Sequence, residues 1–189
     1  MIQLLSEYVV NCLVKKEAIC ESEKKKYFYG CDVIIYTILS TFGLLLFGCI
    51  MGRALESLVC IIVFYTNQSS GGGFHASSHN KCFLTMIAGL SIYILLLSID
   101  MNLLFIIITG IFSLCILFSF PLVLHARKQY LMKFKDNLIK HSKKVVIFEI
   151  IIYAILFLFS LSHLLKIYTI SLWISAISRI SAVVITCIR

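Results

Sequence analysis

The stretch Leu-Leu-Phe-Ile-Ile-Ile-Thr-Gly-Ile-Phe-Ser-Leu-Cys-Ile-Leu-Phe-Ser-Phe, residues 103–120, decides the class of fold, because no charged residue interrupts it. A helix over this run, rising about 1.5 Å per residue, is nearly as long as the ~30 Å hydrocarbon core of a bilayer. The whole chain of 189 residues is 60% hydrophobic, with a mean hydropathy of +1.00. Soluble domains contain only about 45–50% apolar residues, so the composition predicts an all-α polytopic membrane protein.

Other apolar runs on both sides of this stretch predict about six membrane-embedded helices. Together with 103–120, the runs are 31–51, 54–65, 82–99, 145–161 and 167–188. The run 54–65 is too short for an upright span, and a re-entrant segment is the alternative. With no repeat and no linker visible, we expect one membrane domain over residues 1–189.

The first 30 residues predict an interfacial segment with an amphipathic helix. Apolar side chains recur at helical spacing, and polar ones lie between them. The apolar positions are Ile2, Leu5, Val9, Cys12 and Leu13.

Basic residues flank the apolar runs and give a net charge of +8. This placement favours binding to anionic lipid headgroups over binding to nucleic acid. Basic residues beside membrane spans also determine the orientation of a protein in the bilayer. By the positive-inside rule, the segment before residue 31 and the basic loop 121–144 lie in the cytoplasm. An even number of spans between them is consistent with this, and it places both termini and the loop 67–81 on the same side.

A glycine-rich motif, Gly71-Gly72-Gly73-Phe74-His75, precedes Cys82 by a short interval between two apolar runs. A thiol becomes nucleophilic as a thiolate, which a nearby imidazole stabilises. In one continuous helix, His75 and Cys82 would stand about 10.5 Å apart along the axis, so the chain has to turn between them. We therefore expect the next helix to begin near residues 78–80, with Cys82 in its first turn, and residues 67–81 to form an active-site loop.

Two other interpretations of these residues remain open. Cys82 and His75 are equally compatible with packing and interfacial roles, and His75, His79 and Cys82 resemble three zinc ligands. The prediction made here is no metal and no cofactor. The eight cysteines show no paired spacing, so no disulfide framework is expected.

At this motif the chain resembles the accessory gene regulator B family, the membrane endopeptidases that process quorum-sensing propeptides in Gram-positive bacteria. The matching residues are Gly72-Gly73-Phe74-His75-Ala76 followed by Cys82, and the segment 120–128 after the fourth apolar run is also similar. Relatives commonly carry an arginine where this chain has Gln68.

The resemblance implies that Cys82 attacks a propeptide carbonyl and that His75 acts as general base. It also implies an acyl thioester that a peptide cysteine converts into a thiolactone, a bacterial cell-membrane location, and a homodimer. The expected substrate is a short amphipathic propeptide with an acidic tail. The residues expected to bind this substrate or shape the site are Gln68, Gly72, Gly73, Lys133, Lys135, Lys143 and Lys144.

Three ionisable residues, Glu56, Glu149 and Arg179, lie within apolar runs, where an unpaired charge is costly. They are either functional or members of a structural Glu–Arg pair. The competing functions are a peptide exporter or chaperone without chemistry and a zinc-dependent membrane hydrolase.

Overall fold

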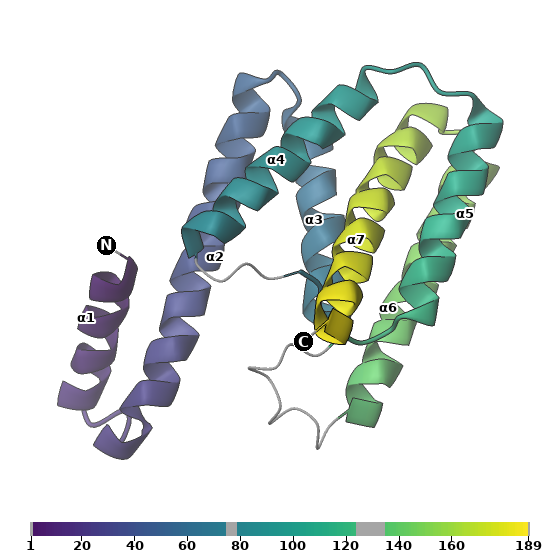
Figure 1. The fold of residues 1–189 in the computed structure, drawn as a ribbon. Coiled ribbons are helices and arrows are strands. Elements are labelled where there is room, and N and C mark those ends of the chain that lie inside the picture. Colours follow the sequence, from purple (N-terminus) through teal and green to yellow (C-terminus); the bar gives the residue numbers. More distant parts are fainter. Residues whose placement is uncertain (1, 75–78, 124–134, 189) are drawn as a thin grey trace. The chain divides into compact units, whose positions relative to one another are not determined.

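The computed structural model describes residues 2–74, 79–123 and 135–188, and helices make up almost all of this part of the chain (Figure 1). The all-α prediction is confirmed for these residues, among which no strand occurs. The helices are α1 (Ile2–Lys15), the short 3-10 helix η1 (Glu21–Glu23), α2 (Lys24–Ile50), α3 (Ala54–Gly71), α4 (His79–Leu97), α5 (Leu103–Ser119), α6 (Lys135–Leu158) and α7 (Ser162–Ile188).

Helices α2 to α7 each contain most of one of the six apolar runs. Within the described part of the chain, three segments are long and apolar enough to cross a bilayer: Glu21–Ile50, Asn80–Leu97 and Ser162–Ile185. Leu103–Ser119 is a shorter apolar helix. The length and composition of these helices therefore support a membrane protein. Three described helices, and not the six predicted, are long and apolar enough to count as candidate spans.

Helix α3 extends well beyond the short run 54–65, so hydropathy underestimated its length. Its last turns contain polar residues that hydropathy reads as the end of a span, yet Asn67 and Ser70 are buried inside the structure. The helix ends at Gly71, and the next residue, Gly72, has a φ of 73°, a positive value that favours glycine. Polar side chains that face protein instead of lipid allow the helix to continue.

Helix α6 begins at Lys135, ten residues before the apolar run 145–161. The second half of the basic loop 121–144 is therefore helical. Its buried side chains, Ser142, Val146, Glu149 and Tyr153, recur every three or four residues and form one face. That face continues from the charged start of α6 into its apolar part.

The chain divides into two compact units, Met1–Phe47 and Gly48–Arg189. In the first, the predicted N-terminal helix is confirmed as α1. The buried positions of α1 are Ser6 and Val10, whereas Leu5 of the expected apolar stripe is 49% exposed. The helix was thus predicted correctly, and its place in the membrane interface stays a prediction.

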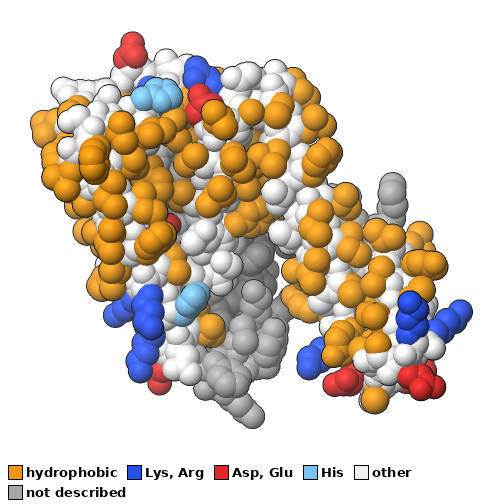
Figure 2. Space-filling view, turned by 180° about the vertical axis from the view of Figure 1, so that it is seen from behind, with side chains coloured by type: hydrophobic (Ala, Val, Ile, Leu, Met, Phe, Trp, Pro, Cys, Tyr) orange, Lys and Arg blue, Asp and Glu red, His pale blue; other side chains and the backbone are white. Residues whose placement is uncertain are grey.

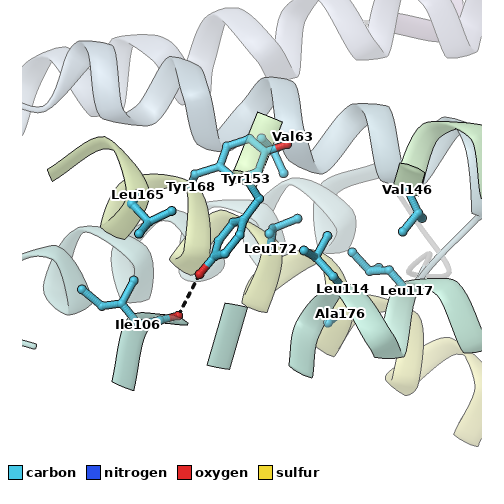
Figure 3. Close-up of a cluster of buried hydrophobic side chains, with 10 residues drawn as sticks. All are labelled: Val63, Ile106, Leu114, Leu117, Val146, Tyr153, Leu165, Tyr168, Leu172 and Ala176. Atoms are coloured by element: carbon cyan, nitrogen blue, oxygen red, sulfur yellow. Dashed lines mark hydrogen bonds between the residues drawn. The ribbon is translucent and has the colours of Figure 1, made fainter. Parts of the chain in front are cut away.

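In the second unit, α7 packs against α3, α4, α5 and α6 (Figure 1). A cluster of buried side chains from α3, α5, α6 and α7 forms the core between them (Figure 3). At one end, the ammonium of Lys166 donates to the carbonyl oxygens of Leu97 and Ile99 at 2.8 and 2.7 Å. This contact caps the C-terminus of α4 with a charge that the helix dipole favours.

The outer surface of the helices is strongly apolar. Figure 2 shows hydrophobic side chains along the helices of the displayed face, with charged side chains gathered near helix ends. Large side chains such as Phe112 and Phe148 are more than half exposed in α5 and α6. A face of this kind is stable against lipid tails and not against water.

Gly110→Ala is expected to destabilise the core. A Cβ atom at Gly110 would overlap the ring of Tyr153, whose hydroxyl donates to the Ile106 carbonyl oxygen at 3.0 Å (Figure 3). We expect a loss of about 1–3 kcal/mol, measured by thermal unfolding in detergent. Gly89→Ala is the matched control, because no atom lies within 4 Å of its added Cβ. Equal stability of the two variants would contradict this packing.

Candidate active site

Cys82 lies in the first turn of α4, which begins at His79. This confirms the start of the helix expected from the sequence. The Cys82 side chain is half-buried, whereas Cys60 is buried and Cys115 is exposed. His75 and residues 76–78 lie outside the described residues, so the proposed pairing of His75 with Cys82 stays a prediction. The zinc alternative also stays a prediction, since it needs His75.

The glycine turn, defined here as Gly71 to Phe74, begins at the last residue of α3 and precedes Cys82 in the sequence. Its first part is held by the segment after α5: the amide of Val123 donates to the Gly71 carbonyl oxygen at 2.8 Å. A Cβ atom at Gly72 would collide with the carbonyl oxygen of Val123. Glycine is therefore required at position 72 both by its backbone angle and by this close approach.

Arg179 of α7 explains the glycine at position 71. A side chain on Gly71 would overlap the guanidinium of Arg179, which is only 1% exposed. The guanidinium donates to the carbonyl oxygens of Asn67 at 2.8 Å, Leu117 at 3.1 Å and Phe120 at 3.2 Å. Leu117 and Phe120 lie at the C-terminal end of α5, where main-chain oxygens lack helical partners, and Asn67 lies in the last turns of α3. A positive charge is favourable near both helix ends. Arg179 thus joins the ends of two helices beside the glycine turn.

Asn67 connects Arg179 to the buried Glu149. Its side-chain amide donates to Glu149 Oε1 at 2.6 Å, while its main-chain oxygen accepts from Arg179. Among the described residues, the ion pairs within 4.0 Å join Arg53 to Glu56 and Lys24 to Glu21, and none joins Glu149 directly to Arg179. The direct Glu149–Arg179 pair considered from the sequence is thus replaced by a bridge through Asn67.

Glu56 belongs to the opposite end of α3. Its carboxylate accepts from Arg53 at 3.0 Å, and its main-chain oxygen accepts from the hydroxyl of Tyr93 at 2.9 Å. Glu56 thus pairs with Arg53 and not with Arg179, the arginine considered from the sequence. Glu56 therefore lies away from the glycine turn.

Gln68 and Ser178 hold the last residue of the glycine turn. The Phe74 amide donates to the main-chain oxygen of Ser178 at 3.1 Å and to its hydroxyl oxygen at 3.2 Å. Gln68 Nε2 donates to the Phe74 carbonyl oxygen at 2.9 Å. A Cβ atom at Gly73 would overlap Gln68 Oε1, so the third glycine permits this approach. Both main-chain polar groups of Phe74 are consequently satisfied.

The basic residues of α6 lie at the same end of the second unit as the glycine turn. Lys143 Nζ lies 5.2 Å from the ring centroid of Phe118, close to the C-terminus of α5 that Arg179 caps. Lys135 and Lys144 are exposed on the same helix. Lys133 lies outside the described residues.

Sequence reasoning missed Asn67, Ser178 and Val123 as parts of this site. Asn67 and Ser178 are polar residues in membrane-embedded helices, and that signal could have found them. Val123 acts through its main chain, which leaves no signature in the sequence.

Apolar helices, a half-buried thiol in the first turn of α4 and a glycine turn fixed by buried polar residues at the end of α3 define a polytopic membrane protein with a candidate cysteine site. A comparison with protein-family models matches accessory gene regulator B over residues 6–185. The chain belongs to the accessory gene regulator B family. Membership supports a role in the processing of autoinducing peptides for quorum sensing at a membrane. No curated protein and no solved structure matches the chain.

Proposed function

We propose that this protein is a membrane cysteine endopeptidase that removes the C-terminal tail of a short propeptide and cyclises the remainder. The observation that carries the proposal is the position of Cys82, in the first turn of an apolar helix that follows the glycine turn. Family membership supplies the substrate class, an autoinducing peptide.

The first turn of a helix suits a nucleophilic thiol. Its main-chain amides lack helical partners, and the helix dipole favours negative charge there. Both effects stabilise a thiolate and also the oxyanion that forms when the thiolate adds to a carbonyl. No other described cysteine combines half-burial with the N-terminal turn of a long helix.

In the proposed reaction, the Cys82 sulfur bonds to a propeptide carbonyl carbon, and the bond to the tail's nitrogen breaks. His75 takes the thiol proton and gives it to the leaving amine. The thiol of a cysteine in the bound peptide then loses its proton to His75 and attacks the thioester. Its sulfur replaces Cys82, which leaves as a thiolate and regains the proton. The second step exchanges one thioester for another, so it needs no water. The first step, in which a thioester replaces a peptide bond, is unfavourable in free energy, and release of the tail shifts its equilibrium toward the products.

The proposal is tested by mass spectrometry of a propeptide co-expressed with the intact enzyme. The expected products are the free tail, a macrocycle lighter than the linear remainder by one water, and an acyl adduct on Cys82 that hydroxylamine removes. A linear product without an adduct would favour the zinc hydrolase, and an unprocessed but transported peptide would favour the exporter. The homodimer implied by the family resemblance is a separate proposal.

We also propose that the active site faces the cytoplasm, with both termini on that side. Cysteines introduced at the exposed positions Asn102 and Ser162 should then react with a membrane-impermeant thiol reagent added to whole cells. Cysteines at Asn137 and Lys140, which are also exposed, should react only after the membrane is opened. A permeant reagent that labels all four is the control. The reverse pattern would place the site outside.

The basic residues Lys133, Lys135, Lys143 and Lys144 are proposed to hold the acidic tail of the propeptide as well as anionic lipid. Replacing Lys133, Lys135, Lys143 and Lys144 by Gln should weaken propeptide binding severalfold at low salt and less at high salt, because salt screens exposed charges. The same four positions changed to Arg keep the charge and should retain binding. Binding that is equal at every ionic strength would leave this segment with a role in topology alone.

A further inference from the structure

Phe74 closes a ring of hydrogen bonds with Gln68 and Ser178. The Phe74 amide donates to the Ser178 hydroxyl oxygen at 3.2 Å, and that hydroxyl donates to Gln68 Oε1 at 3.4 Å. The other end of the same side-chain amide, Gln68 Nε2, donates back to the Phe74 carbonyl oxygen at 2.9 Å. Three residues from α3, the glycine turn and α7 therefore fix one position of the backbone from both sides.

The carbonyl that Gln68 binds belongs to the peptide unit joining Phe74 to His75. A peptide unit is planar, so the bond to Gln68 restrains the plane from which His75 continues. A backbone carbonyl held by a side chain on a packed helix has fewer accessible orientations than one in an open turn. For a general base, a misplacement of about 1 Å can cost roughly a hundredfold in rate.

The base of this ring is itself rigid. Ser178 precedes Arg179, whose two terminal guanidinium nitrogens donate to the main-chain oxygens of Asn67, Leu117 and Phe120. Gln68 follows Asn67, which bridges Arg179 to Glu149. The two residues that hold Phe74 are therefore each adjacent in sequence to a member of the buried polar network.

We infer that Gln68 and Ser178 are positioning residues that set the placement of His75 relative to Cys82. This inference rests on the proposed function, because it requires His75 and Cys82 to act together. It assigns a role to α7, which lies far from the motif in sequence. It also assigns to Gln68 a contact within the protein in place of a contact with substrate.

The kinetic test uses Gln68→Met, which keeps the length of the side chain but can neither donate nor accept. Its kcat for tail cleavage should fall roughly ten- to hundredfold with KM unchanged, as expected when geometry and not substrate binding is lost. In Ser178→Ala, kcat should fall less than in Gln68→Met, because the main-chain oxygen of residue 178 still accepts from the Phe74 amide. The double variant should lose less than the product of the two single effects, because both act on one residue.

A second readout follows the reactivity of Cys82 itself. In a chain whose only cysteine is Cys82, the rate of alkylation by iodoacetamide is measured against pH. In the proposed mechanism His75 activates the Cys82 thiol, so alkylation should be slower in His75→Gln than in the unmodified protein, most of all at low pH. Gln68→Met and Ser178→Ala should shift the profile toward that of His75→Gln. Loss of stability alone would lower the yield of folded protein without changing this profile.

Ser69→Ala and Ser181→Ala are the matched controls. Their hydroxyls donate to main-chain oxygens of their own helices, Thr66 and Ile177, one and three positions from the residues under test. Both should behave as the unmodified protein. If His75→Gln changes the alkylation profile but Gln68→Met and Ser178→Ala do not, the positioning role is wrong while the proposed function stands. If His75→Gln also leaves the profile unchanged, the cysteine–histidine mechanism itself is wrong. A rise in KM at constant kcat for Gln68→Met would make Gln68 a substrate contact instead.

Discussion

Cys82→Ala is expected to abolish tail cleavage completely while leaving the protein folded in the membrane. The variant removes the nucleophile, and a half-buried side chain at the start of α4 contributes little to the core. The measurement is mass spectrometry of the co-expressed propeptide together with the amount of folded protein in the membrane fraction. Both the free tail and the acyl adduct should be missing.

Two other cysteines provide the controls for this prediction. Cys49, near the end of α2, and Cys115, within α5, are both exposed, so their replacement by alanine should leave cleavage unchanged. Cleavage retained by Cys82→Ala would exclude a cysteine endopeptidase. Equal loss in all three variants would point to a general effect on folding.

His75→Gln should reduce the rate of tail cleavage by about 10²–10⁴-fold, because a positioned general base contributes that much. Glutamine keeps a polar side chain but cannot take up a proton. His79→Gln should have a mild effect, since His79 only begins α4 and has no part in the proposed proton transfer. Single-turnover rates on a propeptide with a chromogenic tail measure the difference.

The pair of histidine variants also separates the two chemistries considered from the sequence. A zinc site needs both His75 and His79, so both variants would then be severely impaired and partly restored by added zinc. A cysteine–histidine pair predicts a large loss for His75 alone, with no response to zinc.

Several features of the fold were predictable because they depend on local properties of the chain. The start of α4 followed from the need for the chain to turn between His75 and Cys82. The start of α5 followed from the first residue of the apolar run 103–120, and there the Asn102 side chain accepts from the Leu104 amide at 3.1 Å. The extents of α3 and α6 were not predictable in this way. Both continue through polar residues, such as Asn67 and Ser142, that hydropathy assigns to loops but that the bundle buries.

By itself, the sequence determined the all-helical membrane class, the apolar segments, the basic segments beside them, and Cys82 as a candidate thiol after a glycine motif, since these follow from composition and short-range spacing. Only the tertiary structure explains why positions 71, 72 and 73 are all glycine. Each of them admits a different group from a distant part of the chain: Arg179 at Gly71, Val123 at Gly72 and Gln68 at Gly73. The tertiary structure also decided that Glu149 and Arg179 meet through Asn67 and that Ser178 binds Phe74. Contacts between residues up to 112 positions apart depend on how helices pack, and local patterns in a single sequence carry no information about that packing.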